Sequence, residues 1–226
     1  MKTGADPVES RDAARVQRRY DRQAVTYDIT EVPAEFLLFG RLRKRLWRGV
    51  TGRRVLEIGA GTGKNLAHHP AESRVVAIDI SPKMVARAAT KAARRAHEVD
   101  LIVADAQHLP FRDRVFDASA ATFVFCSVPD AVRGLQEVAR VTEGDVHLLE
   151  HVRAANPIAG RMMDLLNPLT VRLSGANINR DTVANVASAG IGIDGVSSHG
   201  LGIVKLIRGS ASGGDGAKQG LNGGAR

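Results

Sequence analysis

The stretch RRVLEIGAGTGKNL, residues 53–66, places three alternating glycines directly after an apolar run. The apolar residues 54–58 predict a buried strand, and the glycines predict a loop whose bare backbone N–H groups can approach a ligand. The dinucleotide-binding fingerprint has the spacing G-x-G-x-x-G. Here Gly63 comes one residue early and Lys64 takes the fingerprint's slot, so the loop alone is a weak signal for a nucleotide.

Composition limits the class of protein. The chain has 226 residues, of which 44% are apolar and 4% aromatic, which suits one domain with a sizeable aliphatic core. A single cysteine excludes an internal disulfide framework, and we expect a cytoplasmic protein without a signal peptide or a membrane-spanning helix. The formal net charge of +8 favours anionic partners such as nucleic acid, acidic phospholipid or a charged small molecule, or else serves solubility.

Strands and helices alternate from residue 53 onward. The strands are expected at 54–58, 74–79, 99–105, 116–125 and 145–151. The helices between them are expected at 64–69, at 81–97 with Ser81 as N-cap, and at 131–141 with Asp130 as N-cap. Two final apolar runs, 191–198 and 202–209, are close enough to pair antiparallel at the edge. We predict an α/β fold: a Rossmann-like seven-stranded sheet, mostly parallel with an antiparallel last strand, and helices on both faces.

The remaining segments divide the chain into regions. Residues 1–50 form an expected N-terminal region, with a frayed polar start to residue 12 and a basic helix at 34–50. The leucines of that helix either pack on the sheet, which we favour, or lie on an anionic membrane. Residues 51–208 form the binding domain, with a cap at 152–189 whose helical pattern is interrupted by Pro157 and Pro168. The Gly- and Ser-rich residues 209–226 are expected to be disordered.

Three carboxylates follow or end successive strands. Glu57 lies two residues before Gly59, Asp79 ends the second strand, and Asp105 ends the third. Ligands of open α/β sheets bind at the carboxyl ends of the strands, so these acids should converge on one crevice. Asp79 is placed to bind ribose hydroxyls and Asp105 an adenine amino group, while Glu57 would orient the loop and face positive charge. S-adenosylmethionine carries ribose, adenine and a sulfonium; alternatively, each acid alone is a helix cap or turn residue.

With VLEIGAGTG, AIDIS, ADAQHLPF and FDASAATFVFCSV in this order, the chain resembles class I S-adenosylmethionine-dependent methyltransferases. The likeness covers roughly residues 20–208. It is greatest to the group of ubiquinone/menaquinone C-methyltransferases and bacterial phosphatidylethanolamine N-methyltransferases. The resemblance implies that S-adenosyl-L-methionine is the cofactor. It implies cofactor contacts by Tyr27, Glu57, Gly59, Gly61, Thr62, Gly63, Asn65, Asp79, Ile80, Asp105, Ala106 and Thr122.

Fewer residues are candidates for catalysis than for cofactor binding. Tyr27 lies in a segment that resembles the family's lid over the cofactor, although a core tyrosine is the alternative. His151 follows strand five and titrates in the range of a general base, although a structural histidine is the alternative. Cys126 reads as a small apolar filler, and His68 and His69 read as the exposed end of a short helix. We find no metal-ligand cluster. The turn TEGD at 142–145 is shorter than in relatives and is expected to loosen the local register.

The expected substrate follows from the cap. Met162 and Met163 offer an adaptable apolar surface that suits lipid-like substrates. Arg161 and Arg172 could anchor phosphate, and Arg180, Asn177 and Asn179 could orient a headgroup; ordinary core and capping residues are the alternative.

We therefore predict a methyltransferase for a lipid-like or membrane-associated small molecule, first a phospholipid amine as in phosphatidylethanolamine N-methylation. A quinone ring carbon or another small-molecule O-, N- or S-acceptor is the alternative. A second class is an RNA-binding or RNA-methylating protein, which the lack of interleaved aromatics disfavours. A nicotinamide-dependent reductase is a third, disfavoured by Glu57 and by Gly63. Peripheral contact with an anionic membrane is expected, and the sequence gives no oligomeric state.

Overall fold

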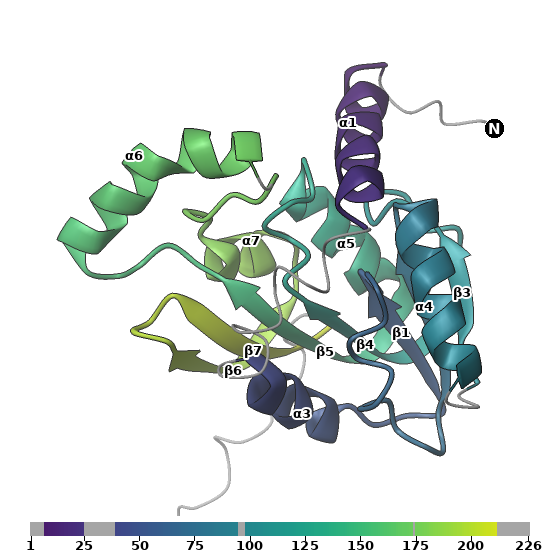
Figure 1. Ribbon diagram of the computed structural model, residues 1–226. Helices are drawn as coiled ribbons and strands as arrows, with labels where there is room; N and C mark the ends of the chain where they lie inside the picture. Colours follow the sequence, from purple (N-terminus) through teal and green to yellow (C-terminus); the bar gives the residue numbers. More distant parts are fainter. Residues whose placement is uncertain (1–6, 25–38, 95–97, 174, 212–226) are drawn as a thin grey trace, which may run out of the picture.

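The computed structural model describes residues 7–24, 39–94, 98–173 and 175–211 (Figure 1). Its helices are α1 (Pro7–Gln23), α3 (Gly40–Gly49), α4 (Pro82–Arg94), α5 (Ala131–Val141), α6 (Pro157–Leu173) and α7 (Thr182–Ser188). Its strands are β1 (Arg54–Ile58), β2 (Arg74–Asp79), β3 (Asp100–Val103), β4 (Phe116–Thr122), β5 (Thr142–His151), β6 (Gly192–His199) and β7 (Val204–Ser210).

The seven strands form one sheet in the order β3-β2-β1-β4-β5-β7-β6. Strands β1 to β5 pair in parallel, whereas β7 runs antiparallel to both β5 and β6. This confirms the predicted mostly parallel sheet with an antiparallel last strand. The chain order reverses between β1 and β4, and such a switch point leaves a crevice at the carboxyl ends of the two strands.

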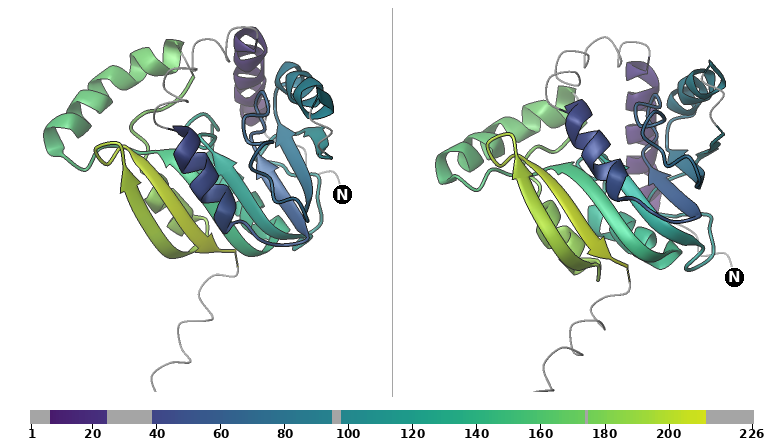
Figure 2. Two further views of the ribbon diagram at one scale, coloured as in Figure 1. Left: turned by 60° about the horizontal axis from the view of Figure 1, so that its bottom comes forward. Right: turned by 90° about the horizontal axis from the view of Figure 1, so that it is seen from below.

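Helices cover both faces of the sheet (Figure 2). On one face, α5 and α7 pack through residues such as Leu135 and Val186 against apolar side chains of β1, β2, β4, β5 and β7. On the other face, Leu46 and Trp47 of α3 pack against Val55 of β1 and its neighbours. The central strand is therefore buried on both sides, which explains its near-continuous apolar sequence.

The helix starts follow the capping chemistry expected from the sequence. The Ser81 hydroxyl accepts the Met84 N–H at 3.2 Å at the start of α4. The Asp130 carboxylate accepts the Arg133 N–H at 2.9 Å at the start of α5. Each cap satisfies a backbone donor that has no partner inside its helix. These two caps are confirmed.

The structure corrects several expected boundaries. Residues 64–69 form a series of turns, not a helix, because the side chains of Asn65 and His69 both point back to Glu57. The first helix begins at Pro7, within the segment expected to be frayed. Helix α6 continues through Pro168; it is largely exposed, so water can satisfy the carbonyl that proline leaves without a donor. Strand β7 extends to Ser210, two residues beyond the expected end of the domain.

The connection from α5 to β5 is shorter than expected. Helix α5 ends at Val141 and β5 begins at Thr142, so residues 142–145 belong to the strand and do not form a turn. Phe116 of β4 pairs with Thr142 of β5, and Ala118 pairs with Asp145, so the register shifts between these two pairs. The expected local irregularity therefore takes the form of a bulge, at the end of the sheet away from the crevice.

The basic helix packs on the protein's own sheet. Leu46 and Trp47 are buried, and Leu42 packs against the same core. This agrees with the favoured alternative for the leucine stripe, although Leu38 lies outside the described residues. Among the helices in the described part of the chain, none has both the length and the apolar character that crossing a bilayer requires.

Candidate functional site

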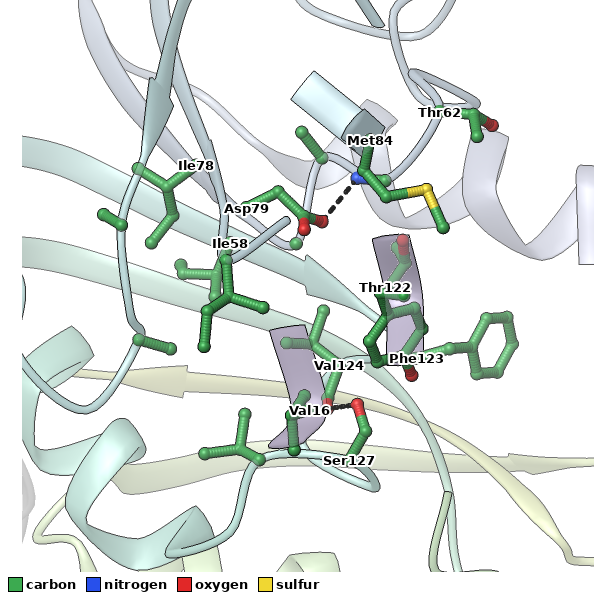
Figure 3. Close-up of a pocket in the computed structure, with 18 of the residues that line it drawn as sticks. Val16, Ile58, Thr62, Ile78, Asp79, Met84, Thr122, Phe123, Val124 and Ser127 are labelled. Atoms are coloured by element: carbon green, nitrogen blue, oxygen red, sulfur yellow. Dashed lines mark hydrogen bonds between the residues drawn. The ribbon is translucent and has the colours of Figure 1, made fainter. Parts of the chain in front are cut away.

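A cavity opens at the carboxyl ends of β1, β2, β3 and β4 (Figure 3). It encloses about 830 Å³ of space, counting its open mouth. The cavity lies at the switch point between β1 and β4, where the topology places a ligand. Its walls carry Ile58, Gly59, Gly61, Thr62, Asn65, Asp79, Ile80, Asp105, Ala106 and Thr122 among the lining residues.

The glycine loop lies close to β2 and to the segment after β4. Gly59 has φ +74°, and a Cβ atom there would lie 2.3 Å from Cγ2 of Val124. Gly61 has φ +52° with no atom within 4 Å of an ideal Cβ position. Gly59 is therefore required by close packing, whereas the space at Gly61 leaves its backbone open to the cavity.

Asp79 ties the glycine loop to the loop after β2. One carboxylate oxygen accepts the Gly61 N–H at 2.8 Å, and the other accepts the Ser81 N–H at 2.9 Å. Burial raises the pKa of Asp79 to about 6, because these two hydrogen bonds do not fully replace water around the charge. A carboxylate has about four lone-pair positions, so Asp79 keeps acceptors for ribose hydroxyls.

Asp105 is held by a buried glutamine that sequence reasoning missed. The Gln107 side-chain nitrogen donates to both carboxylate oxygens of Asp105 at 3.1 Å. The Gln107 side-chain oxygen accepts the Asp130 N–H at 3.0 Å, which connects this site to the start of α5. Ile80 and Ala106 line the same cavity. Asp105 therefore has a fixed orientation beside an apolar surface that suits an adenine ring.

Glu57 does not line the cavity, contrary to the expectation that it faces the positive charge of a ligand. Its side chain is 1% exposed; one oxygen accepts the Asn65 side-chain N–H at 2.6 Å, and the other lies 2.9 Å from Nε2 of His69. Glu57 therefore orients Asn65, which lines the cavity, in agreement with the expected role in ordering the loop. The same contact buries His69, so the expected exposure of that histidine is wrong.

Arg43 is the main cavity residue that sequence reasoning missed. Its guanidinium is buried, donating to the Asn65 side-chain oxygen at 3.1 Å and the Thr122 hydroxyl at 2.5 Å. It also lies 5.3 Å from the centre of the Phe123 ring. A signal was available, because position 43 shares the buried face of α3 with Leu46. Arg43 and Lys64 bring positive charge to a cavity wall that also carries Asp79 and Asp105.

The segment after β4 forms the far wall of the cavity. Phe123 lines the cavity, and the His151 ring stacks on it at 4.5 Å between centroids. His151 itself is not among the lining residues. Glu150 is fully buried and accepts the N–H groups of Val124 and Phe125 at 2.8 and 3.1 Å. Burial raises the pKa of Glu150 to about 7. Through its hydrogen bond to Val124, a lining residue, Glu150 supports the cavity wall without lining the cavity itself.

Cys126 and the expected lid complete this side of the site. Cys126 is buried, and burial raises the pKa of its thiol well above its usual range, as expected for a filler and not for a nucleophile. Tyr27 lies outside the described residues. Within them, Val16 and Tyr20 of α1 reach the cavity. The N-terminal helix therefore covers part of the site.

The expected substrate residues are not brought into the cavity. Met162 is exposed on α6, and the Met163 sulfur accepts the Ala154 N–H at 3.3 Å. Arg180 donates to the Val128 carbonyl at 2.7 Å, and thereby holds the cavity wall from outside. Asn177 and Asn179 are likewise bonded within the protein. In the part of the chain that the structure describes, no group of three or more His, Cys, Asp or Glu side chains is arranged to hold a metal ion.

Comparison with known proteins identifies the class. A methyltransferase-domain family matches residues 56–149. The chain is 36% identical over 155 residues to a phosphatidylethanolamine N-methyltransferase of Cereibacter sphaeroides, covering 64% of this chain and 72% of that protein. It is 36% identical over 141 residues to a demethylmenaquinone methyltransferase of Beutenbergia cavernae, covering 58% of this chain. The chain spans only 55% of that second relative.

The fold agrees with this assignment. An S-adenosylmethionine-dependent methyltransferase structure from Methanosarcina mazei superposes with a TM-score of 0.60 and 21% identity, covering 72% of this chain and 95% of that one. The glycine loop, Asp79 and Asp105 around one cavity fit an adenosyl group. The chain belongs to the methyltransferase-domain family of S-adenosylmethionine-dependent enzymes. The alternatives of a nicotinamide-dependent reductase and of an RNA-binding protein without enzymatic activity are therefore set aside.

Replacing Arg43 tests the positive charge in the cavity. We expect Arg43→Met to weaken the binding of S-adenosylhomocysteine about 10- to 100-fold, because the carboxylate of the ligand's amino-acid part would lose the buried guanidinium that we expect it to contact. Affinity for 5′-methylthioadenosine, which lacks the amino-acid part, should hardly change. Calorimetry with both ligands measures this, and Arg45→Met on the exposed side of α3 is the matched control. An equal loss for both ligands would show that Arg43 acts only through the fold.

The raised pKa of Asp79 predicts a pH dependence. Above pH 6 the group is a carboxylate that can accept two ribose hydroxyls, and below pH 6 it is protonated and accepts less well. Affinity for S-adenosylhomocysteine should therefore fall by up to about tenfold between pH 7.5 and 5. Titration calorimetry across this range should show the fall in the natural protein, and weak, nearly pH-independent binding in Asp79→Asn. The same slope in both proteins would assign the titration to another group.

Proposed function

We propose that this chain transfers a methyl group to the amine of a phospholipid. The observation that carries the proposal is its similarity to the phosphatidylethanolamine N-methyltransferase of Cereibacter sphaeroides, which extends over 72% of that protein. The apolar residues on the far cavity wall, among them Phe123, Val124 and Val128, also suit a lipid-like acceptor.

The cofactor contacts in this proposal use the residues around the cavity. S-adenosylmethionine supplies a methyl group bound to a positively charged sulfur. Asp79 accepts the ribose hydroxyls and Asp105 the adenine amino group, while Gly61 leaves room for the methionine part. Arg43 faces the carboxylate of that part. Buried hydrogen bonds hold these side chains before the ligand arrives, so little ordering remains to be done on binding.

The transfer requires alignment and the loss of one proton. The nitrogen lone pair forms the new N–C bond while the S–C bond breaks, which leaves S-adenosylhomocysteine. An ammonium with a pKa of roughly 10 must first lose a proton to become a nucleophile. We propose His151, in contact with the cavity wall through Phe123, as the proton acceptor, and Tyr27 as part of the lid. Residues 152–189 serve as the substrate cap.

Methylation of a quinone ring carbon is the second candidate. The similarity to the demethylmenaquinone methyltransferase of Beutenbergia cavernae supports it, at the same 36% identity but over a smaller share of the relative. The same cavity would hold the cofactor for either acceptor, because the proposed cofactor contacts do not involve the acceptor.

Radiolabelled methyl transfer distinguishes the two acceptors. The protein is incubated with labelled S-adenosylmethionine and either dispersed phosphatidylethanolamine or reduced demethylmenaquinone, and the products are separated by chromatography. We expect label in monomethylated and more highly methylated phosphatidylethanolamine. Asp79→Ala should abolish it, whereas Asp100→Asn, at the opposite end of the sheet, should not. Label in menaquinone alone would replace the amine proposal with the ring-carbon alternative.

A further inference from the structure

Helix α6 exposes a set of large apolar side chains to solvent. Ile158 is 77% exposed, Leu165 75% and Leu169 55%. Met162 and Leu166 are exposed as well. Positions 158, 162, 165, 166 and 169 share one face of a helix, because residues three and four apart are neighbours. We call these five side chains the α6 stripe. Contiguous exposed apolar surface of this kind marks a site of interaction.

Charged side chains border the α6 stripe on one side. Arg161 and Arg172 are both exposed and lie roughly three turns apart along the same border. The acidic residue of the helix, Asp164, points the other way and is paired with Arg153 at 2.7 Å. The face that α6 presents to solvent is therefore apolar with a positive edge.

The inner side of α6 is joined to the wall of the cofactor cavity. The Asn167 side-chain oxygen accepts the Ile178 N–H at 2.9 Å, and its nitrogen donates to the Asn177 side chain at 3.2 Å. The Asn177 N–H in turn donates to the Cys126 carbonyl at 2.8 Å. The next residue, Ser127, lines the cavity. A short series of hydrogen bonds thus fixes the α6 stripe relative to the reaction site.

A second apolar group projects beside the start of α6. Leu201 is fully exposed in the turn between β6 and β7, and Ile203 is partly exposed. The Ile203 carbonyl accepts the Val152 N–H at 2.9 Å, at the point where the chain leaves β5 for α6. Figures 1 and 2 show α6 and this hairpin turn extending from the same side of the sheet.

We propose that the α6 stripe, with Leu201 in the hairpin turn, inserts into the surface of an anionic phospholipid bilayer. This proposal rests on the lipid acceptor proposed above. Helix α6 projects from the body of the protein (Figure 1), so its outer face, which carries the stripe, can lie against a fluid bilayer. The flanking arginines and the net charge of +8 complement acidic headgroups. A helix of 17 residues is about 25 Å long and lies in the plane of the interface.

Membrane binding is tested by flotation with vesicles of phosphatidylcholine, with and without phosphatidylglycerol, at low salt. The natural protein should float with the anionic vesicles, and Leu165→Gln/Leu169→Gln should lower the partition coefficient more than about tenfold. Ile193→Thr/Val196→Thr, which changes exposed apolar side chains of β6, is the matched control and should float normally. An unchanged melting temperature and S-adenosylhomocysteine affinity establish that each variant is folded.

The outcomes separate this proposal from the proposed acceptor. Flotation that Leu165→Gln/Leu169→Gln does not reduce, or no flotation of the natural protein, would overturn the membrane surface. If light scattering shows that the natural protein is a dimer and the same double variant is a monomer, the stripe binds a second copy of the chain, and this result would also overturn the membrane proposal. Methylation of a short-chain, water-soluble phosphatidylethanolamine by the natural protein tests the acceptor without a membrane. Flotation without such methylation would retain the membrane surface and reject the amine acceptor.

Discussion

The hydrogen bonds of Asp79 are the interactions on which the cavity at the switch point of the sheet depends. This one carboxylate accepts backbone N–H groups from Gly61 and from Ser81, so it fixes the glycine loop after β1 relative to the start of α4. The parallel pairing of β1 with β2 brings the ends of both strands to the same edge of the sheet. The remaining acceptors of the carboxylate are then available to a ligand in the cavity between them.

A second network supports the same cavity from the opposite side. Glu57 and Arg43 are both buried, and both bond to Asn65, so a negative and a positive side chain balance each other through one amide. Buried charges of this kind are costly unless they are paired and hydrogen-bonded. Their arrangement therefore holds Asn65 and Thr122 in place at the cavity wall. The carboxylate inside the apolar β1 strand thus serves the ligand indirectly, through the loop.

Much of the fold was predictable because its determinants are local. Short sequence patterns predict the alternation of strands and helices, the caps Ser81 and Asp130, and Asp79 at the end of β2. Asp105 lines the cavity as expected, but it lies two residues after the end of β3 and does not end the strand. Arg43 was not predicted, because its partner Thr122 is 79 residues away and a lone arginine on a basic helix reads as solvated. The turns at 64–69 were not predicted either, because they depend on side-chain hydrogen bonds from Asn65 and His69 to the buried Glu57. The exposure of α6 was missed because an apolar pattern does not reveal whether another element covers it.

The central claim is that an adenosyl group is held at the switch point of the sheet by Asp79 and Asp105. A crystal structure of the protein with S-adenosylhomocysteine tests it most directly. The account predicts the ribose hydroxyls within hydrogen-bond distance of the Asp79 carboxylate and the adenine amino group at Asp105, with the amino-acid part along the glycine loop towards Arg43. Ligand bound elsewhere, or bound in this cavity with neither carboxylate in contact, would contradict it.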